Sequence, residues 1–340
     1  MSKVTLKVIA KTLGISTSTV SKALKNYSDI NEETKTKVQE LAKKLNYTPN
    51  SFAVSLRMKE SKTIGVIIPT MVHHFFSNVI EGILKEAERN NYMIFLMQSN
   101  EDFELEKKQI DLLLSKGVDG VIMSLSNKTR DFSHLQKVID SNVPLILFDK
   151  IAKTINCSKV LIDDRKAAYD AVTHLINKGY KRIAHFRGDL NPQNSIDRFL
   201  GYKKALLDHN IEFDPTLVYI CDNNSDFSDG FNSAEKLIND HGKNVDGLFT
   251  VNDLIAIGAL DYFNKNNIKV PEQIAIFGFS NWFMTKITNP SLSSIDQNAL
   301  KMGEKSTEIL IKEIDYKHKG IAYEYQKIIL DTELIIRNSC

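Results

Sequence analysis

The sequence has few cysteines, no long hydrophobic run and no signal peptide. Its three cysteines, Cys157, Cys221 and Cys340, lie far apart among 340 residues, so they offer neither a disulfide framework nor a C-x-x-C metal site. No hydrophobic run approaches the roughly 20 residues that cross a bilayer, and the N-terminus lacks the hydrophobic core of a signal peptide. We therefore expect a cytoplasmic protein without a membrane partner.

The motifs of common enzyme classes are also missing. There is no P-loop, no G-x-G-x-x-G and no H-E-x-x-H, and the segment G-F-S-N-W around Ser280 lacks the second glycine of a nucleophile elbow. His73 and His74 are adjacent, but no acidic or cysteine residue stands at metal-ligand spacing from them. The sequence therefore predicts no catalytic residue, no metal and no cofactor.

Charge is divided unevenly along the chain. Residues 1–60 contain 11 Lys and Arg against 5 Asp and Glu, a net charge of +6, whereas residues 61–340 contain 33 against 37, a net charge of −4. A basic segment on a mildly acidic body suggests that the segment contacts a polyanion.

Three short helices are predicted in the basic segment. The first spans about 6–13, with Thr5 as its N-cap and Gly14 in the turn after it; the second begins after Ser16 and the third after Asn31, both good N-caps. Two helices around a short turn that contains glycine, with a third to complete a small core, form a helix-turn-helix.

The second helix carries an unusual number of hydroxyl groups for its length. At about 100° per residue, Val20, Ala23 and Leu24 point inward, and the outward face holds polar and basic side chains: Ser18, Ser21, Lys22 and Lys25, flanked by Thr17 and Asn26. Short donors and acceptors near base edges, with cations for phosphate or guanine, suit a recognition helix. A solvated polar face is the alternative, and the turn, the charge and the third helix together favour DNA contact.

A further short helix is predicted after the third. Pro49 ends the third helix, and Asn50 can cap a segment that carries Phe52, Ala53 and Leu56. Because this segment is too short to be stable alone, it is either a linker that folds when it pairs with its twin on DNA or a simple amphipathic connector.

From residue 62 the pattern changes to alternating strands and helices. Nine short β-branched runs separated by helical stretches indicate parallel sheets covered by helices. We therefore predict an all-α head and an α/β core, with these ranges: a helix-turn-helix head at 1–48, a linker at 49–61, and a two-lobed core at 62–340 whose N-lobe comprises about 62–160 plus 291–322 and whose C-lobe comprises about 161–290 plus 323–340.

The core is expected to bind a small polar molecule. Ligands of parallel sheets bind at the carboxyl ends of the strands, and polar side chains follow several of the predicted strands. These ends hold Pro69 to Phe76, Asp149 and Lys150, Asn252 and Asp253, and Ser280 to Trp282.

The chain resembles the lactose/galactose-repressor (LacI/GalR) family of bacterial transcription factors over nearly its whole length. The head resembles the family signature in V-T-L-K-V-I-A-K-T-L-G-I-S-T-S-T-V-S-K-A-L, then in N-Y-T-P-N and A-V-S-L-R. The core resembles the family's periplasmic-binding-protein-like fold in V-D-G-V-I, D-R-F-L-G-Y and V-N-D-L-I-A-I-G-A-L.

The resemblance implies which residues contact DNA. Thr17, Ser18 and Lys22 match base-reading positions. The family's paired hinge leucines wedge into the minor groove, which favours the linker that folds on DNA, since unstacking is offset by contacts on the kinked duplex. The DNA-binding residues expected in all are Thr5, Ser16, Thr17, Ser18, Thr19, Ser21, Lys22, Asn26, Asn50, Ala53, Leu56 and Arg57.

The resemblance also implies an effector site. The residues that match effector-contacting positions are Phe75, Asp149, Arg198, Asn252 and Asp253, with Ser280 beside them. Three departures from the family stand out. Val54 replaces a common arginine, and His73-His74 replaces a common Asn-Pro. Ser280 takes the place of an aspartate that often binds two sugar hydroxyls, which leaves room for an acidic or phosphorylated sugar.

These expectations describe a homodimeric regulator that represses carbohydrate-utilisation genes. Each head would read half of a pseudo-palindromic double-stranded operator, and a sugar or sugar derivative between the lobes would change DNA affinity. Three alternatives remain open: a cytoplasmic solute-binding sensor, an enzyme with a regulatory head, and a catabolite-control-type regulator that uses a protein corepressor.

Overall fold

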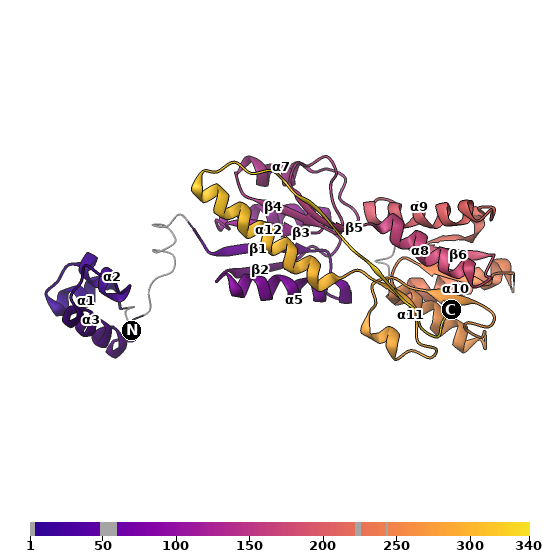
Figure 1. Ribbon diagram of the computed structural model, residues 1–340, viewed down its shortest axis with the longest axis horizontal. Coiled ribbons are helices and arrows are strands. Elements are labelled where there is room, and N and C mark those ends of the chain that lie inside the picture. The colour runs from indigo at the N-terminus through magenta and orange to yellow at the C-terminus, as the bar shows by residue number, and fades with distance from the viewer. Residues whose placement is uncertain (1–3, 48–59, 222–225, 243) are drawn as a thin grey trace. The chain divides into compact units, whose positions relative to one another are not determined.

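The computed structural model describes residues 4–47, 60–221, 226–242 and 244–340. They belong to two compact units, Met1–Ser61 and Lys62–Cys340 (Figure 1).

The first unit contains the three helices expected of the head: α1 (Leu6–Leu13), α2 (Thr17–Leu24) and α3 (Glu32–Lys44). Gly14 follows α1 with a φ of +64°, a left-handed conformation that glycine adopts without strain. The side chain of Ser16 accepts a hydrogen bond from the N–H of Thr19 at the start of α2. A small core joins the three helices, built from Ile9, Ala10, Val20, Ala23, Val38 and Ala42.

The first lobe of the second unit is a six-stranded parallel sheet in the order β11-β5-β4-β3-β1-β2. Helices α5 (His74–Arg89) and α12 (Ala299–Lys319) pack on one face, and α6 (Phe103–Ser115) and α7 (Ser133–Asp140) pack on the other. The strands are β1 (Thr63–Ile68), β2 (Met93–Gln98), β3 (Gly120–Met123), β4 (Leu145–Phe148), β5 (Ser158–Ile162) and β11 (Lys327–Leu330).

Alternate residues of these strands pack on opposite faces of the sheet. Ile122 of β3 and Ile146 of β4 belong to the core beneath α5 and α12, whereas Val121 and Leu147 belong to the core beneath α6 and α7. A parallel sheet covered on both faces needs strands that are hydrophobic throughout. The continuous apolar runs in the sequence follow from this burial.

The second lobe is a four-stranded parallel sheet in the order β7-β6-β8-β9. Four helices cover it, and a small antiparallel pair, β10 with β12, completes the unit. The helices are α8 (Asp164–Asn177), α9 (Gln193–Asp208), α10 (Phe227–His241) and α11 (Asp253–Lys265); the strands are β6 (Ile183–Arg187), β7 (Val218–Ile220), β8 (Gly247–Thr250), β9 (Ala275–Phe277), β10 (Ser294–Asp296) and β12 (Glu333–Ile335).

The division of the chain between the lobes differs from the expected one in two places. We expected 323–340 in the C-lobe, but β11 pairs with β5 in the sheet of the first lobe. We expected 291–322 in the N-lobe, but Leu292 packs in the core of the second lobe and Ser293 pairs with Phe277 of β9. Both errors concern short segments in the last fifty residues, which are not among the nine predicted strands and whose pairing depends on segments far away in the sequence.

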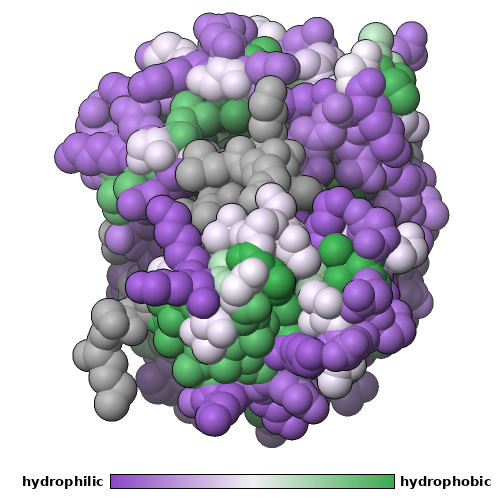
Figure 2. All heavy atoms as spheres, turned by 90° about the vertical axis from the view of Figure 1, so that its left-hand side faces the viewer, coloured by the Kyte–Doolittle hydropathy of each residue, from purple (hydrophilic) through white to green (hydrophobic). Residues whose placement is uncertain are grey.

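The face shown in Figure 2 is mainly hydrophilic, and hydrophobic side chains gather in patches on it. Among the described residues, no helix combines the length and the hydrophobicity that crossing a bilayer requires.

Helices α5 and α12 cross with their backbones in contact, and two glycines make this possible. A Cβ atom on Gly303 of α12 would lie 2.0 Å from the carbonyl oxygen of Val79, and one on Gly82 of α5 would lie 2.0 Å from the carbonyl oxygen of Leu300. Because the obstructing atoms belong to helix backbones, a side chain fits at either position only if the helices move apart.

We therefore expect Gly303→Ala to destabilise the core by about 1–3 kcal/mol, the usual cost of overpacking. The free energy of unfolding would be measured by urea denaturation. Lys301→Ala, at an exposed position of the same helix, is the matched control and should change it little. Equal free energies of unfolding for the two variants would show that α5 and α12 can move apart without loss of stability.

Candidate functional site

The outward face of α2 carries the residues predicted to read DNA bases. Thr17, Ser18 and Lys22 are exposed, whereas Val20 and Ala23 on the opposite side of the helix are buried. The helix is thus fixed by one side and presents the other to solvent, as a recognition helix requires.

Several neighbouring polar groups already have partners within the unit. The Ser16 hydroxyl caps α2 and also lies 2.8 Å from the Thr19 hydroxyl, so both help to define the start of the helix. Asn26, which follows α2 with a φ of +56°, accepts a hydrogen bond from Gln39 of α3 at 2.9 Å. Thr5 occupies the N-cap position of α1, but its side chain makes no capping bond there.

The remaining DNA-binding predictions fall on the linker. Asn50, Ala53, Leu56 and Arg57 lie outside the described residues, as does Val54.

In the second unit, all six residues predicted to contact an effector line a single cleft between the lobes: Phe75, Asp149, Arg198, Asn252, Asp253 and Ser280. The space between its walls is about 830 Å³, including the open mouth. The residues come together because the carboxyl ends of the parallel strands in both lobes border this space.

Strand ends and backbone conformation position these side chains. Asp149 directly follows β4 with a φ of +55°, and Asn252 follows β8 and caps α11 by accepting the N–H of Ile255 at 2.9 Å. Ser280 follows β9 with a φ of +111°. Such conformations are costly for residues other than glycine and tend to occur at binding sites.

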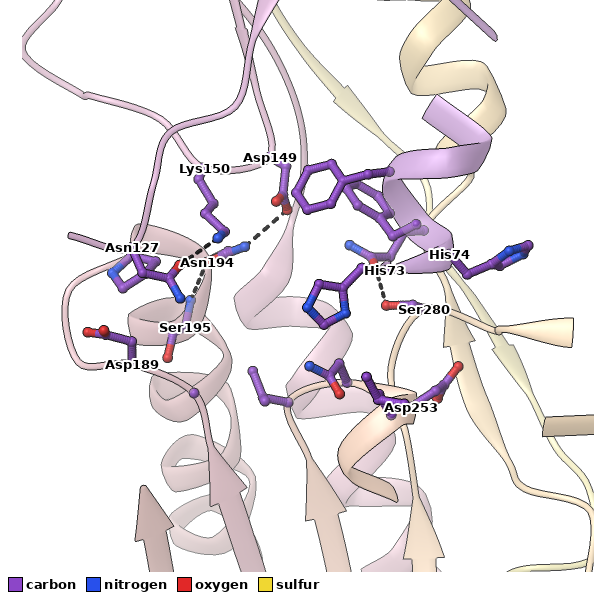
Figure 3. Close-up of a pocket in the computed structure, with 18 of the residues that line it drawn as sticks. His73, His74, Asn127, Asp149, Lys150, Asp189, Asn194, Ser195, Asp253 and Ser280 are labelled. Atoms are coloured by element: carbon purple, nitrogen blue, oxygen red, sulfur yellow. Dashed lines mark hydrogen bonds between the residues drawn. The ribbon is translucent and has the colours of Figure 1, made fainter. Parts of the chain in front are cut away.

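One hydrogen bond crosses the cleft from lobe to lobe. The amide of Asn194, on α9 of the second lobe, donates to a carboxylate oxygen of Asp149 in the first lobe at 3.0 Å (Figure 3). Both side chains are buried. The relative position of the lobes is therefore tied to a residue that is itself a predicted ligand contact.

The two strongly basic residues of the cleft are paired with acids. Lys150 donates to Glu101 at 2.7 Å and to Asn127 at 2.5 Å. Arg198 donates to Asp164 at 2.8 Å through Nε and to the Val251 carbonyl at 2.7 Å through Nη1. Arg198 was expected to contact an effector, but two of its donor groups, Nε and Nη1, are engaged inside the protein.

Asp253 is also engaged by the protein. Ser294 donates to one carboxylate oxygen and the N–H of Trp282 to the other, each at 2.6 Å. The side chain is almost fully buried, and this burial raises the pKa of Asp253 to about 6. Its position against the loop after β9 indicates that it holds this loop in place.

The sequence analysis missed several polar residues of the cleft, and two of them, Ser195 and Gln297, have atoms unpaired among the described residues. Ser280 donates to Oε1 of Gln297 at 2.8 Å, and within the described chain neither Nε2 of Gln297 nor the hydroxyl of Ser195 has a hydrogen-bond partner. Both side chains are more than nine-tenths buried. No local pattern marks either residue, because Ser195 lies in the first turn of a helix and Gln297 in a loop.

Other side chains complete the walls. His73 points into the cleft and His74 away from it (Figure 3), and the ring of Trp282 adds an aromatic surface. No group of three or more potential metal ligands occurs in the part of the chain that the structure describes.

Comparison with known proteins agrees with these features. Residues 61–329 match the family described as periplasmic binding proteins and sugar binding domain of the LacI family, and residues 5–50 match the bacterial regulatory proteins of the lacI family. The two matches together include the described helices of the head and most of the core.

Relatives match over nearly the full length. The HTH-type transcriptional regulator RegA of Clostridium acetobutylicum is 34% identical over 340 residues, and the HTH-type transcriptional repressor PurR of Haemophilus influenzae is 30% identical over 337 residues; each match covers 98% of both chains. The crystal structure of the lac repressor dimer bound to operator and the anti-inducer ONPF has the same fold, with a TM-score of 0.87 at 24% identity and 99% coverage of both chains. The chain therefore belongs to the LacI family and is a DNA-binding transcription regulator.

Proposed function

We propose that the protein is a repressor that binds a pseudo-palindromic operator as a homodimer and responds to a small molecule in the cleft. The observation that carries this proposal is the outward face of α2, where Thr17, Ser18 and Lys22 are exposed on a helix anchored by its other side. Base edges in the major groove offer donors and acceptors that such side chains can read. As a regulator of transcription, the protein would act in the cytoplasm.

The effector that best suits the cleft is uncharged and rich in hydroxyl groups. The cations Lys150 and Arg198 are neutralised by Glu101 and Asp164, and no other lysine or arginine lines the cleft within the described ranges. A phosphate or carboxylate would therefore bring an unpaired charge into a buried site, which costs more than neutral hydroxyl groups do. This favours a neutral sugar over the acidic or phosphorylated sugar that Ser280 left open.

The unpaired atoms of Ser195 and Gln297 support the same ligand class. A buried donor without a partner costs about 1–3 kcal/mol, and a ligand oxygen near Nε2 of Gln297 or the Ser195 hydroxyl would remove that cost. The Trp282 ring and Phe75 provide the apolar surface against which a sugar ring packs.

Coupling between ligand and DNA would act through the lobes. A ligand that competes for Asp149 exchanges the bond between Asp149 and Asn194 for contacts of its own. The ligand thereby favours a different arrangement of the lobes. The shift in the equilibrium between the two arrangements is limited by the difference in the ligand's affinity for them.

The dimer is supported by an apolar edge on the first lobe. Strand β2 is the last strand of its sheet, and Met93, Phe95 and Leu96 on it are exposed, as is Leu84 on the neighbouring α5. An unpaired apolar edge favours association with another chain. A second copy of the same chain would bury it.

The function is tested by selecting genomic fragments with the purified protein at near-physiological salt, since low salt favours nonspecific binding. We expect enrichment of one palindromic sequence. Replacing both Thr17 and Ser18 by Ala should abolish the enrichment, whereas Thr36→Ala, at an exposed position on α3, should preserve it. Enrichment that survives the change in α2 would place base reading elsewhere.

The effector class is tested by thermal unfolding with a panel of neutral mono- and disaccharides and their phosphates. We expect a neutral sugar to raise the melting temperature and its phosphate to have no effect. Ser195→Ala should then weaken binding of that sugar about fivefold, the equivalent of one hydrogen bond of about 1 kcal/mol. The exposed Ser141→Ala is the control. A larger shift from the phosphates would contradict the assignment.

The interface is tested by sedimentation. Phe95→Asp places a charge on the apolar edge of β2 and should shift the protein from dimer to monomer at micromolar concentration. Leu207→Asp, on an α9 side chain that is 74% exposed, should leave the dimer intact. If only Leu207→Asp dissociates the dimer, the copies associate through the second lobe.

A further inference from the structure

Lys22, the base-reading cation of α2, forms an ion pair within the head. Its ammonium group donates a hydrogen bond to the carboxylate of Asp29, which lies in the loop between α2 and α3. The bond raises the pKa of Lys22 and lowers the pKa of Asp29, so both groups are charged at neutral pH.

The loop brings Asp29 to this place through its own backbone. The N–H of Tyr27 donates to the carbonyl of Lys22 at 3.1 Å, and the N–H of Ile30 donates to the carbonyl of Tyr27 at 3.3 Å. The chain therefore turns back across the C-terminal end of α2, and Asp29 reaches a residue seven positions earlier.

This pair differs from the ion pairs found along the described part of α3. Lys35 pairs with Glu32 and Lys37 with Glu33, one turn apart along α3, as is common on exposed helices. The Lys22 pair instead joins the predicted DNA-reading face to the following loop.

The geometry of an ammonium group suggests what the pair does. Lysine has three donor hydrogens, and Asp29 takes one of them. Two remain, and guanine presents two acceptors, O6 and N7, in the major groove. A lysine whose direction is set by a neighbouring carboxylate can present those two hydrogens to one base.

The carboxylate also discriminates against the DNA backbone. A free lysine on a flexible stem reaches any nearby phosphate, and such contacts supply nonspecific affinity. With Asp29 beside the ammonium group, an approaching phosphate meets a negative charge as well as a positive one. The neutral acceptors of guanine avoid this repulsion.

We propose that Asp29 is a specificity-determining residue: it positions Lys22 for a guanine of the operator half-site and opposes the contact of Lys22 with phosphates. The inference rests on the proposed function, namely that α2 reads operator bases. Asp29 itself touches no base and acts through Lys22.

The experiment compares the full-length protein with Asp29→Asn, which keeps the side-chain shape and removes its charge. Each protein selects binding sequences from a random DNA library, and affinity is then measured for the selected site and for unrelated duplex over a range of salt. We expect the variant to lose its guanine preference at one position per half-site. We also expect the ratio of specific to nonspecific affinity to fall about tenfold, the scale of one well-made base contact.

Two further variants distinguish this role of Asp29 from a general effect of net charge on DNA affinity, and thermal unfolding distinguishes it from an effect on folding. Glu33→Gln removes one negative charge from an equivalent exposed ion pair; it should change affinity for all sequences alike and leave the selected site unchanged. In a Lys22→Met background, Asp29→Asn should no longer alter base preference, since the two residues act together. Thermal unfolding of each variant reports whether the head still folds.

The outcomes are distinct. If the unaltered protein enriches no sequence, the proposed function fails. If it enriches a site and Asp29→Asn enriches the same site with the same guanine preference, the inference about Asp29 is wrong. It is also wrong if Glu33→Gln reproduces the effect or if the effect persists without Lys22.

Discussion

Parallel strand pairing is the constraint on which the core depends. Because the strands within each of its two main sheets run in one direction, all their carboxyl ends lie on one edge of that sheet. Polar residues that directly follow the strands, such as Asp149 and Asn252, are thereby brought to one place without any sequence proximity. The two edges border a common cleft, so a residue of one lobe can bond to a residue of the other, as Asn194 does to Asp149.

This arrangement buries charged groups, and their burial underlies the ligand class proposed for the cleft. A buried charge without a partner is strongly destabilising, so Lys150 and Arg198 each have an acid supplied by the protein. Desolvation raises the pKa of Asp164 to about 6 even beside Arg198. Besides these pairs, the cleft offers a ligand the carboxylates of Asp149 and Asp189, neutral donors and acceptors such as Ser195 and Gln297, and the aromatic surface of Trp282.

The sequence predicted most of the elements because their signals are local. N-caps such as Ser16 and Asn31 and the apolar strand runs indicate structure within a few residues, and the six predicted cleft residues do line one cleft. Pairing depends on distant chain segments, so the place of β11 and of Leu292 was predicted wrongly. Local sequence patterns also could not predict hydrogen-bond partners. Nothing in the sequence near Arg198 indicates that its guanidinium bonds to Asp164. Nothing near Gln297 indicates that its amide nitrogen has no partner within the described chain.

The cleft and the head each contain an ion pair between a basic residue and an aspartate: Arg198 with Asp164, and Lys22 with Asp29. The two pairs differ in solvent exposure. The side chains of Arg198 and Asp164 are 6% and 9% exposed, whereas those of Lys22 and Asp29 are 47% and 52% exposed. Separating a buried pair leaves an uncompensated charge at a cost of several kcal/mol, so a ligand that contacts Arg198 would have to leave its pair with Asp164 intact. An exposed pair contributes little stability. In the proposed complex, the ammonium group of Lys22 would therefore be able to donate to a base while Asp29 remains beside it. Under the proposed function, the buried pair would disfavour anionic ligands in the cleft, and the exposed pair would select among the contacts of Lys22 with operator DNA.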